Sequence, residues 1–360
     1  MELTGNTFFF QWEVDLIIWL QAHMGSFGTS LASFLSAFGE ELACVAVLGF
    51  IYWCYDKRFG RFVGMNALFA LVLNPMIKCA VLRRRPYFDT PEIKCLKPIK
   101  KDADIFNIAA QEYSFPSGHS TNAVTVYGSI ALYKRENKAL TVIAVLLALL
   151  IGVSRFCLGV HYPTDVLCGW LLGLAVILFV PWLQKKLNND RMLYAMMLLV
   201  TLPGFFYCRS HDFFEGYGML LGFALAMEFE QKYVNFENTR GVLRCILRVV
   251  GGVAVFFGLN TLLKMPFSQD FLNSAEMASL LVRTVRYTLV VFAVLGVYPM
   301  LFKYTAKWFE KPEENKAEKT DEKPAEKPEQ AKKGALTAFV RDISQILQHT
   351  EETRVVYHHL

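Results

Sequence analysis

Three short stretches of this 360-residue chain carry the residue types needed to hold and cleave a phosphate ester. They are Lys78 with Arg85-Pro86, residues 115–119, and Ser154-Arg155 followed by His161 and Asp165, and these residues supply three cations, two imidazoles, a carboxylate and a glycine turn. Each stands beside a long apolar run, where charged side chains are costly and normally mark a site. Phosphoryl transfer needs charge neutralised on the phosphate oxygens, an in-line nucleophile and a proton for the leaving oxygen. This set meets those needs without a metal.

Lys78, Arg85 and Arg155 are the candidates for neutralising the charge of the phosphate. The planar fork of arginine can engage two oxygens at once, and it stays charged at any relevant pH. Lys78 is expected at the end of a membrane span, with its stem in the apolar layer and its ammonium group at the site. Taken singly, each of these cations is more often only a residue that snorkels from a helix end.

The segment Ser117-Gly118-His119 precedes a long apolar run and is predicted to begin a helix. Free backbone N–H groups at such a start form an anion site, and Gly118 lets the chain approach a phosphate closely. Ser117 adds a hydroxyl donor, and Pro116 fixes the turn before it. By itself this turn is only a good helix start, but beside the three cations it predicts phosphate binding.

Two histidines divide the remaining chemistry. We expect His161 to attack phosphorus as a neutral imidazole and to form a phosphohistidine. Asp165 is expected to hold the other ring nitrogen of His161 and so to fix its tautomer. Pro163 suits the first position of a helix, which places Asp165 in the first turn. His119 is then the general acid for the leaving oxygen. A lone histidine at a membrane edge is more often structural, whereas two within phosphate-binding motifs favour catalysis.

These residues imply no metal and no other cofactor. The two histidines lie in separate motifs without a third ligand, and the pair His211-Asp212 is interpreted as structural. The eight cysteines show no CxxC pair. Cys95 lies in a polar loop, where either a free thiol or a disulfide is possible.

The composition is that of an all-α, polytopic membrane protein. The chain is 54% hydrophobic, against roughly 45–50% for a soluble protein, and apolar runs long enough to cross a bilayer as helix recur along it. This excludes the soluble classes. We expect about nine spans, at about residues 40–55, 61–82, 119–133, 139–158, 163–183, 191–207, 213–229, 242–263 and 279–303.

Lysine and arginine in alternate short loops set the expected orientation, with the N-terminus outside and the C-terminal tail in the cytoplasm. Loop 83–118 breaks this pattern, and we attribute part of its excess charge to anion binding. Its cations are Arg83, Arg84, Arg85, Lys94, Lys97, Lys100 and Lys101. All three motifs then fall on the extracytoplasmic face of the cell membrane. The chain has no N-x-[ST] acceptor, which favours a bacterial source.

The C-terminal segment has a different composition. Residues 310–334 are a Lys/Glu/Pro tract without hydrophobic periodicity and are predicted to form a disordered linker. Apolar residues then recur at helical spacing over residues 335–349, which predicts one short amphipathic helix. That helix could dock on the membrane, on a partner or on its own copy.

The chain resembles the type-2 phosphatidic acid phosphatase superfamily, whose signature reads K-x6-R-P, then P-S-G-H, then S-R-x5-H-x3-D. These stand here at residues 78–86, 116–119 and 154–165, with every position filled at the expected spacing. The resemblance covers roughly residues 40–185 and implies a six-helix-type core with an extracytoplasmic site. It also implies metal-independent dephosphorylation through a phosphohistidine at His161. The implied phosphate contacts are Lys78, Arg85, Ser117, Gly118 and Arg155.

The resemblance also suggests a division of the chain and a substrate class. The expected parts are an N-terminal interfacial segment (1–39), a phosphatase core (40–185), additional transmembrane helices (186–309), the linker (310–334), and the amphipathic helix with its tail (335–360). The topology is similar to that of the glucose-6-phosphatase and sphingosine-phosphate phosphatase branches. A site at membrane level favours a lipid substrate whose tail stays in the bilayer.

Candidate substrates are phosphatidic acid, phosphatidylglycerophosphate and undecaprenyl diphosphate. The alternatives are a phosphotransferase to an acceptor other than water, a phosphatase of soluble sugar phosphates, and a non-catalytic transporter or scaffold. The presence of His119, His161 and Asp165 argues against the last, because pure binding needs neither an acid nor a nucleophile.

Overall fold

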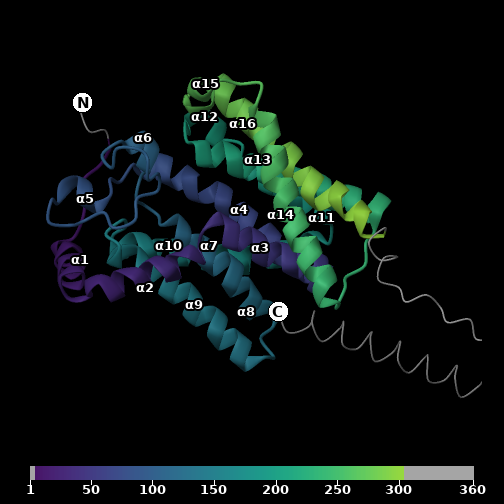
Figure 1. Ribbon diagram of the computed structural model, residues 1–360, viewed down its shortest axis with the longest axis horizontal. Coiled ribbons are helices and arrows are strands. Elements are labelled where there is room, and N and C mark those ends of the chain that lie inside the picture. Colours follow the sequence, from purple (N-terminus) through teal and green to yellow (C-terminus); the bar gives the residue numbers. More distant parts are fainter. Residues whose placement is uncertain (1–4, 304–360) are drawn as a thin grey trace, which may run out of the picture. The chain divides into compact units, whose positions relative to one another are not determined.

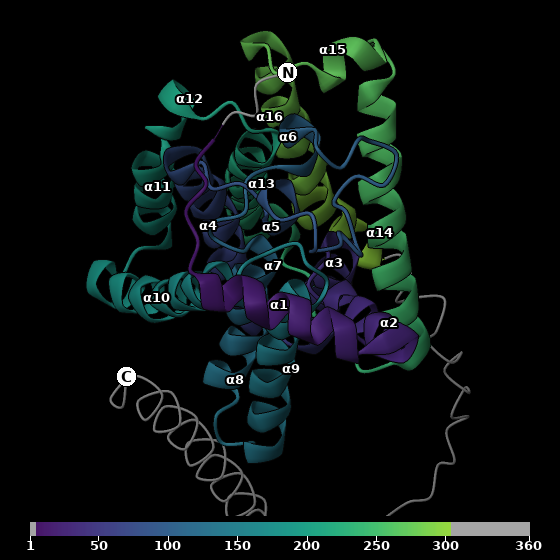
Figure 2. The ribbon, with the colours of Figure 1, turned by 90° about the vertical axis from the view of Figure 1, so that its left-hand side faces the viewer.

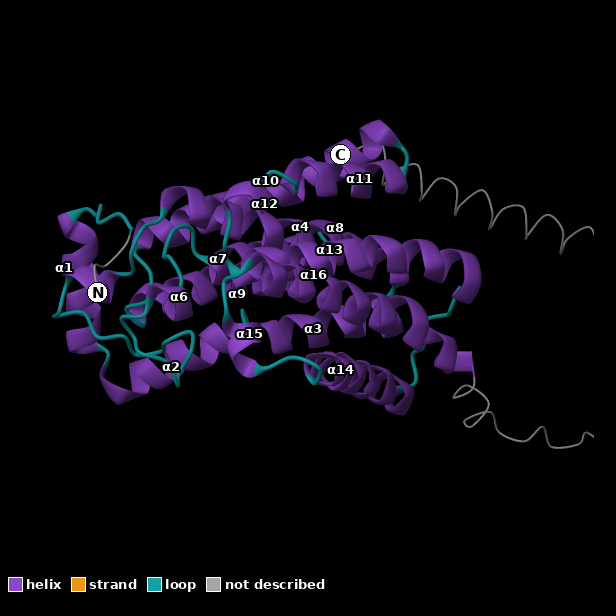
Figure 3. Cartoon of the chain, turned by 90° about the horizontal axis from the view of Figure 1, so that it is seen from above, coloured by secondary structure: helices purple, strands orange, loops and turns teal. Residues whose placement is uncertain are grey.

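The computed structural model describes residues 5–303, and every named element in that range is a helix (Figures 1 and 3). The predicted all-α class is therefore confirmed for the described residues. The α-helices are α1 (Gln11–His23), α2 (Gly25–Ala37), α3 (Glu41–Phe50), α4 (Lys57–Val81), α5 (Pro86–Asp89), α6 (Ile108–Gln111), α7 (Gly118–Ala123), α8 (Ser129–Tyr133), α9 (Lys138–Cys157), α10 (Pro163–Leu187), α11 (Asp190–Thr201), α12 (Gly204–Tyr207), α13 (His211–Phe229), α14 (Val242–Lys264), α15 (Gln269–Asn273) and α16 (Met277–Phe292). Short π or 3-10 segments are η1 (Ile51–Tyr55), η2 (Val124–Gly128), η3 (Glu230–Val234), η4 (Ala293–Val297) and η5 (Tyr298–Leu301).

Five helical segments of the described range are long and apolar enough to cross a membrane. They are α4, α9, α10, α14 and the run Met277–Leu301, and a sixth span results if Gly25–Ala37 and Leu42–Tyr55, bent by 47°, count as one. The chain is thus a membrane protein with several spans. The continuous run through α7, η2 and α8 and the helix α11 are both shorter than 18 residues, and the count of nine stays a prediction.

Helix starts and ends place the motif residues at one end of the bundle. Helix α4 begins after Asp56, whose carboxylate accepts from the backbone N–H groups of Arg58 and Phe59, and Lys78 falls in its last turn. Helix α10 begins at Pro163, and Asp165 in its first turn accepts from the Tyr162 backbone N–H at 2.7 Å. The motifs converge because the C-terminal end of α4 and the N-terminal end of α10 lie at the same end of the bundle.

Helix α1 crosses this end of the bundle (Figure 2). Its outer surface is aromatic, since Trp12 is 52% exposed and Trp19 is 57% exposed, whereas the carboxylate of Glu13 is fully buried. A helix on the surface of a soluble protein would instead bury its tryptophans and expose its glutamate. Indole rings favour the level of lipid headgroups, so the arrangement suits the interfacial position predicted for residues 1–39.

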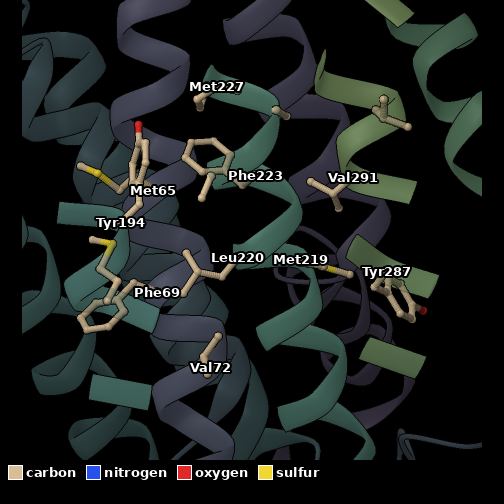
Figure 4. Close-up of a cluster of buried hydrophobic side chains, with 14 of the residues drawn as sticks. Met65, Phe69, Val72, Tyr194, Met219, Leu220, Phe223, Met227, Tyr287 and Val291 are labelled. Carbon is tan, nitrogen blue, oxygen red and sulfur yellow. The ribbon is translucent and has the colours of Figure 1, made fainter. Parts of the chain in front are cut away.

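The largest cluster of buried apolar side chains joins the N-terminal helices to the later ones (Figure 4). Met65 and Phe69 of α4 lie in it beside Tyr194 of α11 and Phe223 of α13, and the last two rings meet edge to face at 5.8 Å. Lipid tails are as apolar as these side chains, so close packing must hold the helices together.

Helices α13 and α16 approach each other most closely where α13 has glycines. A Cβ atom at Gly218 would overlap the carbonyl oxygen of Thr284. The hydroxyl group of Thr288 donates to the carbonyl oxygen of Gly218 at 3.1 Å. Gly218 and Gly222 form a GxxxG pattern, which lets two backbones meet in a membrane.

The eight cysteines all lie within the described residues, and none forms a disulfide. Cys95, for which the sequence left two possibilities open, is a half-buried free thiol. The predictions for the linker at 310–334 and the amphipathic helix at 335–349 fall outside the described residues.

We predict that Gly218→Ala destabilises the protein by about 1–3 kcal/mol, because the added methyl group forces two helix backbones apart. Thermal unfolding in detergent should then begin several degrees lower. The control is Gly258→Ala on α14, where no atom lies within 4 Å of the new Cβ. An unchanged melting temperature in the Gly218 variant would contradict the close packing described here.

Candidate active site

The three motifs of the sequence meet around the ring of His161. His161 lies in the turn between α9 and α10 and is 2% exposed. Burial lowers the pKa of this imidazole well below 6.5, and nearby positive charges lower it further. In order of effect, those charges belong to Arg85, Arg155 and Lys78. Cations from the first and third motifs therefore lie around one neutral imidazole.

The two ring nitrogens of His161 have different surroundings. Nε2 lies 3.3 Å from Nη1 of Arg85, so the nitrogen expected to attack faces a cation that a phosphate could share. Nδ1 lies 3.6 Å from Oδ2 of Asp165, which is longer than a hydrogen bond. Nδ1 has no hydrogen-bond partner among the described residues. The predicted orienting bond from Asp165 would require a small rotation of the ring.

Asp165 is itself held rigidly, by groups outside the predicted set. One carboxylate oxygen accepts from Nη1 of Arg83 at 2.7 Å, and the other accepts from the hydroxyl group of Ser114. Arg83 also pairs through Nη2 with Glu13 of α1 at 2.9 Å, and Glu13 accepts in turn from the backbone N–H of Thr164. All these groups except Thr164 are fully or almost fully buried.

Arg83 corrects part of the sequence interpretation. It was counted among the loop cations whose excess was attributed to anion binding, but its guanidinium is occupied by two carboxylates and by the Phe8 carbonyl oxygen. It lies between the rings of Phe8 and Tyr162, at 4.7 and 4.1 Å. Arg83 therefore organises the site without facing the phosphate position. Neither Glu13 nor Ser114 belongs to a motif, so the sequence offered no signal for them.

Arg85 is fixed by backbone carbonyl groups. Its Nε donates to the oxygens of Gln111 and Glu112 at 2.7 and 3.0 Å, and its Nη1 donates to the oxygen of Val160 at 2.7 Å. These bonds orient the fork without neutralising its charge. The positive charge of Arg85 thus remains available to an anion beside His161.

Arg155 has unused hydrogen-bonding capacity. Its Nη1 donates to the hydroxyl group of Ser36 at 2.5 Å, and its Nε has no partner among the described residues. It is 2% exposed. A buried guanidinium that lacks a carboxylate partner is suited to an incoming phosphate.

The helix start at Gly118 has the geometry of an anion cradle. Ser117 caps it, accepting from the backbone N–H and the hydroxyl group of Ser120 at 3.4 and 2.9 Å. The nearest atom to a Cβ built on Gly118 is Oδ1 of Asn74, at 3.6 Å. No protein atom therefore fills the space that the missing side chain leaves. His119 follows in the first turn, within electrostatic range of Arg155 and His161.

Lys78 is already paired, with a residue that the sequence did not point to. Its Nζ lies 2.9 Å from Oε2 of Glu112, whose side chain is 20% exposed. Glu112 has a left-handed backbone conformation with φ 58°. A substrate phosphate must share Lys78 with this carboxylate or displace it.

Comparison with known proteins gives two adjoining matches. Residues 59–189 match the family described as the PAP2 superfamily, and residues 214–307 match the one described as PAP2 superfamily phosphatase, transmembrane extension. No solved structure matches the chain.

The chain is similar to several curated proteins. It is 41% identical over 87 residues to phosphatidylglycerophosphatase B of Bacillus subtilis (22% of this chain, 43% of the relative). It is 29% identical over 144 residues to undecaprenyl-diphosphatase of Sulfolobus acidocaldarius (40% and 64%). It is 28% identical over 163 residues to lipid A 1-phosphatase of Rhizobium etli (40% and 66%). The chain thus spans between 43% and 66% of the length of these relatives.

We predict that Arg83→Ala destabilises the protein by about 3–5 kcal/mol, because it leaves two buried carboxylates without their partner. Unfolding in detergent, followed by circular dichroism against temperature, measures the loss. The control is Arg191→Ala, which removes an ion pair to Glu228 whose arginine is 76% exposed, and it should cost less than about 1 kcal/mol. Equal losses in the two variants would show that Arg83 is not an organising residue.

Proposed function

The chain belongs to the PAP2 superfamily, and on that premise we propose that it is an integral membrane phosphatase that hydrolyses a phosphate ester of a lipid. The observation that carries the proposal is the gathering of three cations, two from the first motif and one from the third, around the neutral ring of His161. A binding protein would need the cations but not a buried, uncharged imidazole among them.

The proposed mechanism has two steps. Nε2 of His161 attacks phosphorus while the bond from phosphorus to the ester oxygen breaks, and His119 donates the proton that the departing alkoxide takes up. A water molecule then attacks the phosphohistidine, His119 accepts a proton from it, and inorganic phosphate and free His161 result. Asp165 stabilises the imidazole during the first step, because the ring becomes positive as the N–P bond forms.

The charges of Lys78, Arg85 and Arg155 neutralise the equatorial oxygens in both steps. The backbone N–H group of Gly118 adds an uncharged donor, whereas that of Ser117 already donates to the carbonyl oxygen of Asp165 at 2.9 Å. No step requires a metal or another cofactor, because these groups supply the charge that a metal would otherwise supply.

The proposed substrates are phosphate monoesters or diphosphates of lipids, of the phosphatidic acid, phosphatidylglycerophosphate or undecaprenyl diphosphate class. The names of the relatives support this, since each names a lipid phosphate or diphosphate. The motif residues also stand at the ends of spanning helices, at the depth where lipid headgroups lie. A lipid can therefore present its phosphate sideways while its tail stays in the bilayer.

The proposed topology has about nine spans, an outside N-terminus and a cytoplasmic tail, in the cell membrane of a bacterium. The site then opens on the extracytoplasmic face. The alternation of cation-rich short loops supports this orientation. The covalent intermediate also permits transfer to an acceptor other than water, so the products must be identified as well as counted.

We predict that His161→Ala abolishes phosphate release and that His119→Ala lowers kcat by about 10²–10⁴-fold. Purified protein is assayed against phosphatidic acid, phosphatidylglycerophosphate, undecaprenyl diphosphate and glucose 6-phosphate, with and without excess EDTA. The control is His23→Ala, whose ring lies on α1 and contacts the Trp19 carbonyl oxygen. Full activity in the His161 variant, or strict dependence on added metal, would overturn the mechanism.

We also predict an activity profile that extends to unusually low pH. The nucleophile must be neutral, and burial together with Arg85 holds the pKa of His161 below its usual 6.5. On the acid side, activity should therefore be lost as the pH falls through that lowered value. The pH dependence of kcat/KM reports the free enzyme, and its acid limb should lie clearly below pH 6.5. An acid limb at or above this value would contradict the environment described for His161.

A further inference from the structure

A second carboxyl group stands behind the carboxylate that pairs with Lys78. Asp212, the second residue of α13, hydrogen-bonds through its side chain to the side chain of Glu112. Glu112 falls within the matched core, residues 59–189, whereas Asp212 belongs to the segment that leads into the transmembrane extension. Only the side chains of Glu112 and Asp212 therefore separate Lys78 from the start of α13.

Two carboxyl groups in direct contact must share a proton, because both cannot be ionised at this distance without strong repulsion. Burial raises the pKa of Glu112, but the ammonium group of Lys78 and the bond to Asp212 lower it to about 2. Burial raises the pKa of Asp212, and the negative charge of Glu112 raises it further. Of the two groups, Asp212 is therefore the one that holds the shared proton, and the pair with that proton carries a single negative charge.

The surroundings of the pair are charged on every side. Other charged groups shift the pKa values of Asp212 and Glu112. They are Lys78 on α4, Arg85 at the N-cap of α5, and Glu215 one turn along α13. Glu215 is in turn paired with Arg283 of α16 at 3.3 Å, which limits its influence on Asp212. His211 faces the other way, toward the carbonyl oxygen of Ser274.

We propose that Asp212 is a positioning residue of the phosphate site, which keeps the Glu112–Asp212 pair singly charged so that a substrate phosphate can reach Lys78. The inference rests on the proposed phosphatase function and gives the transmembrane extension a part in it. When the phosphate arrives, Glu112 gives up its place on Lys78 and keeps the hydrogen bond from the Asp212 carboxylic acid. An ionised Asp212 could not donate that bond, and it would add a second negative charge opposite the incoming anion.

The proposal predicts a KM that rises in alkali. Between pH 7.5 and pH 9.5 a phosphate monoester is already a dianion, with a second pKa near 6. Loss of the proton of Asp212 as the pH rises should raise KM on the order of tenfold, because a second negative charge then faces the incoming phosphate. In Asp212→Asn the amide is neutral and still donates to Glu112, so the ratio of KM at pH 9.5 to KM at pH 7.5 should fall to roughly twofold or less.

The matched control is Asp270→Asn, the same substitution at an exposed position of α15 in the extension, and it should keep the wild-type ratio. Glu112→Gln is the second variant, because a pair with one amide cannot become doubly charged and should also lose the alkaline rise. Phosphate release from phosphatidic acid in mixed micelles at each pH gives KM and kcat separately.

The outcomes separate the two proposals. A wild-type protein that releases no phosphate from any lipid overturns the proposed function. An active wild type without an alkaline rise in KM overturns only the role of Asp212, and so does an Asp212→Asn variant that keeps the rise. If Asp212 had only a structural role, its substitution would lower kcat at every pH. The ratio of KM at pH 9.5 to KM at pH 7.5 would then stay at the wild-type value, which overturns the proposal.

Discussion

The guanidinium group of Arg83 is the interaction on which the rest of the site depends. It is buried at the meeting point of three segments: α1 through Glu13, the loop after α4 that carries Arg83 itself, and the start of α10 through Asp165. A buried charge is tolerated only when it is paired and hydrogen-bonded, and here two carboxylates and a carbonyl oxygen meet that requirement. Because Asp165 lies four residues after His161, whatever fixes Asp165 also limits where the ring of His161 can lie.

The cations of the site therefore fall into two groups with different roles. Arg85 and Arg155 keep charge that an anion can use, and Lys78 shares its charge with Glu112, whereas Arg83, two residues before Arg85, is paired with two carboxylates. The difference comes from what each guanidinium meets. Carbonyl oxygens orient Arg85 and leave it positive, whereas carboxylates neutralise Arg83. The charge offered to an anion then comes from cations that a buried, hydrogen-bonded frame holds in place.

The later helices are joined to this frame by packing and by polar contacts. The glycine positions on α13 bring its backbone against α16, and the same helix places Asp212 against Glu112. Helix α4 carries Lys78 to the same end of the bundle. The helix that enters the segment described as a transmembrane extension thus contacts the loop that carries Glu112.

The sequence by itself determined the all-α membrane class, and it predicted the reacting groups. The length of a hydrophobic run reflects the thickness of a bilayer, and the motif spacings reflect local helix starts and ends. Both features are therefore visible in the linear sequence. What only the tertiary structure decided are the contacts between residues far apart in the chain. Arg83 with Glu13 and Lys78 with Glu112 join groups separated by 70 and 34 residues. Whether a cation faces a phosphate or a buried carboxylate depends on which neighbour the fold brings to it, and residue type and local spacing carry no record of that.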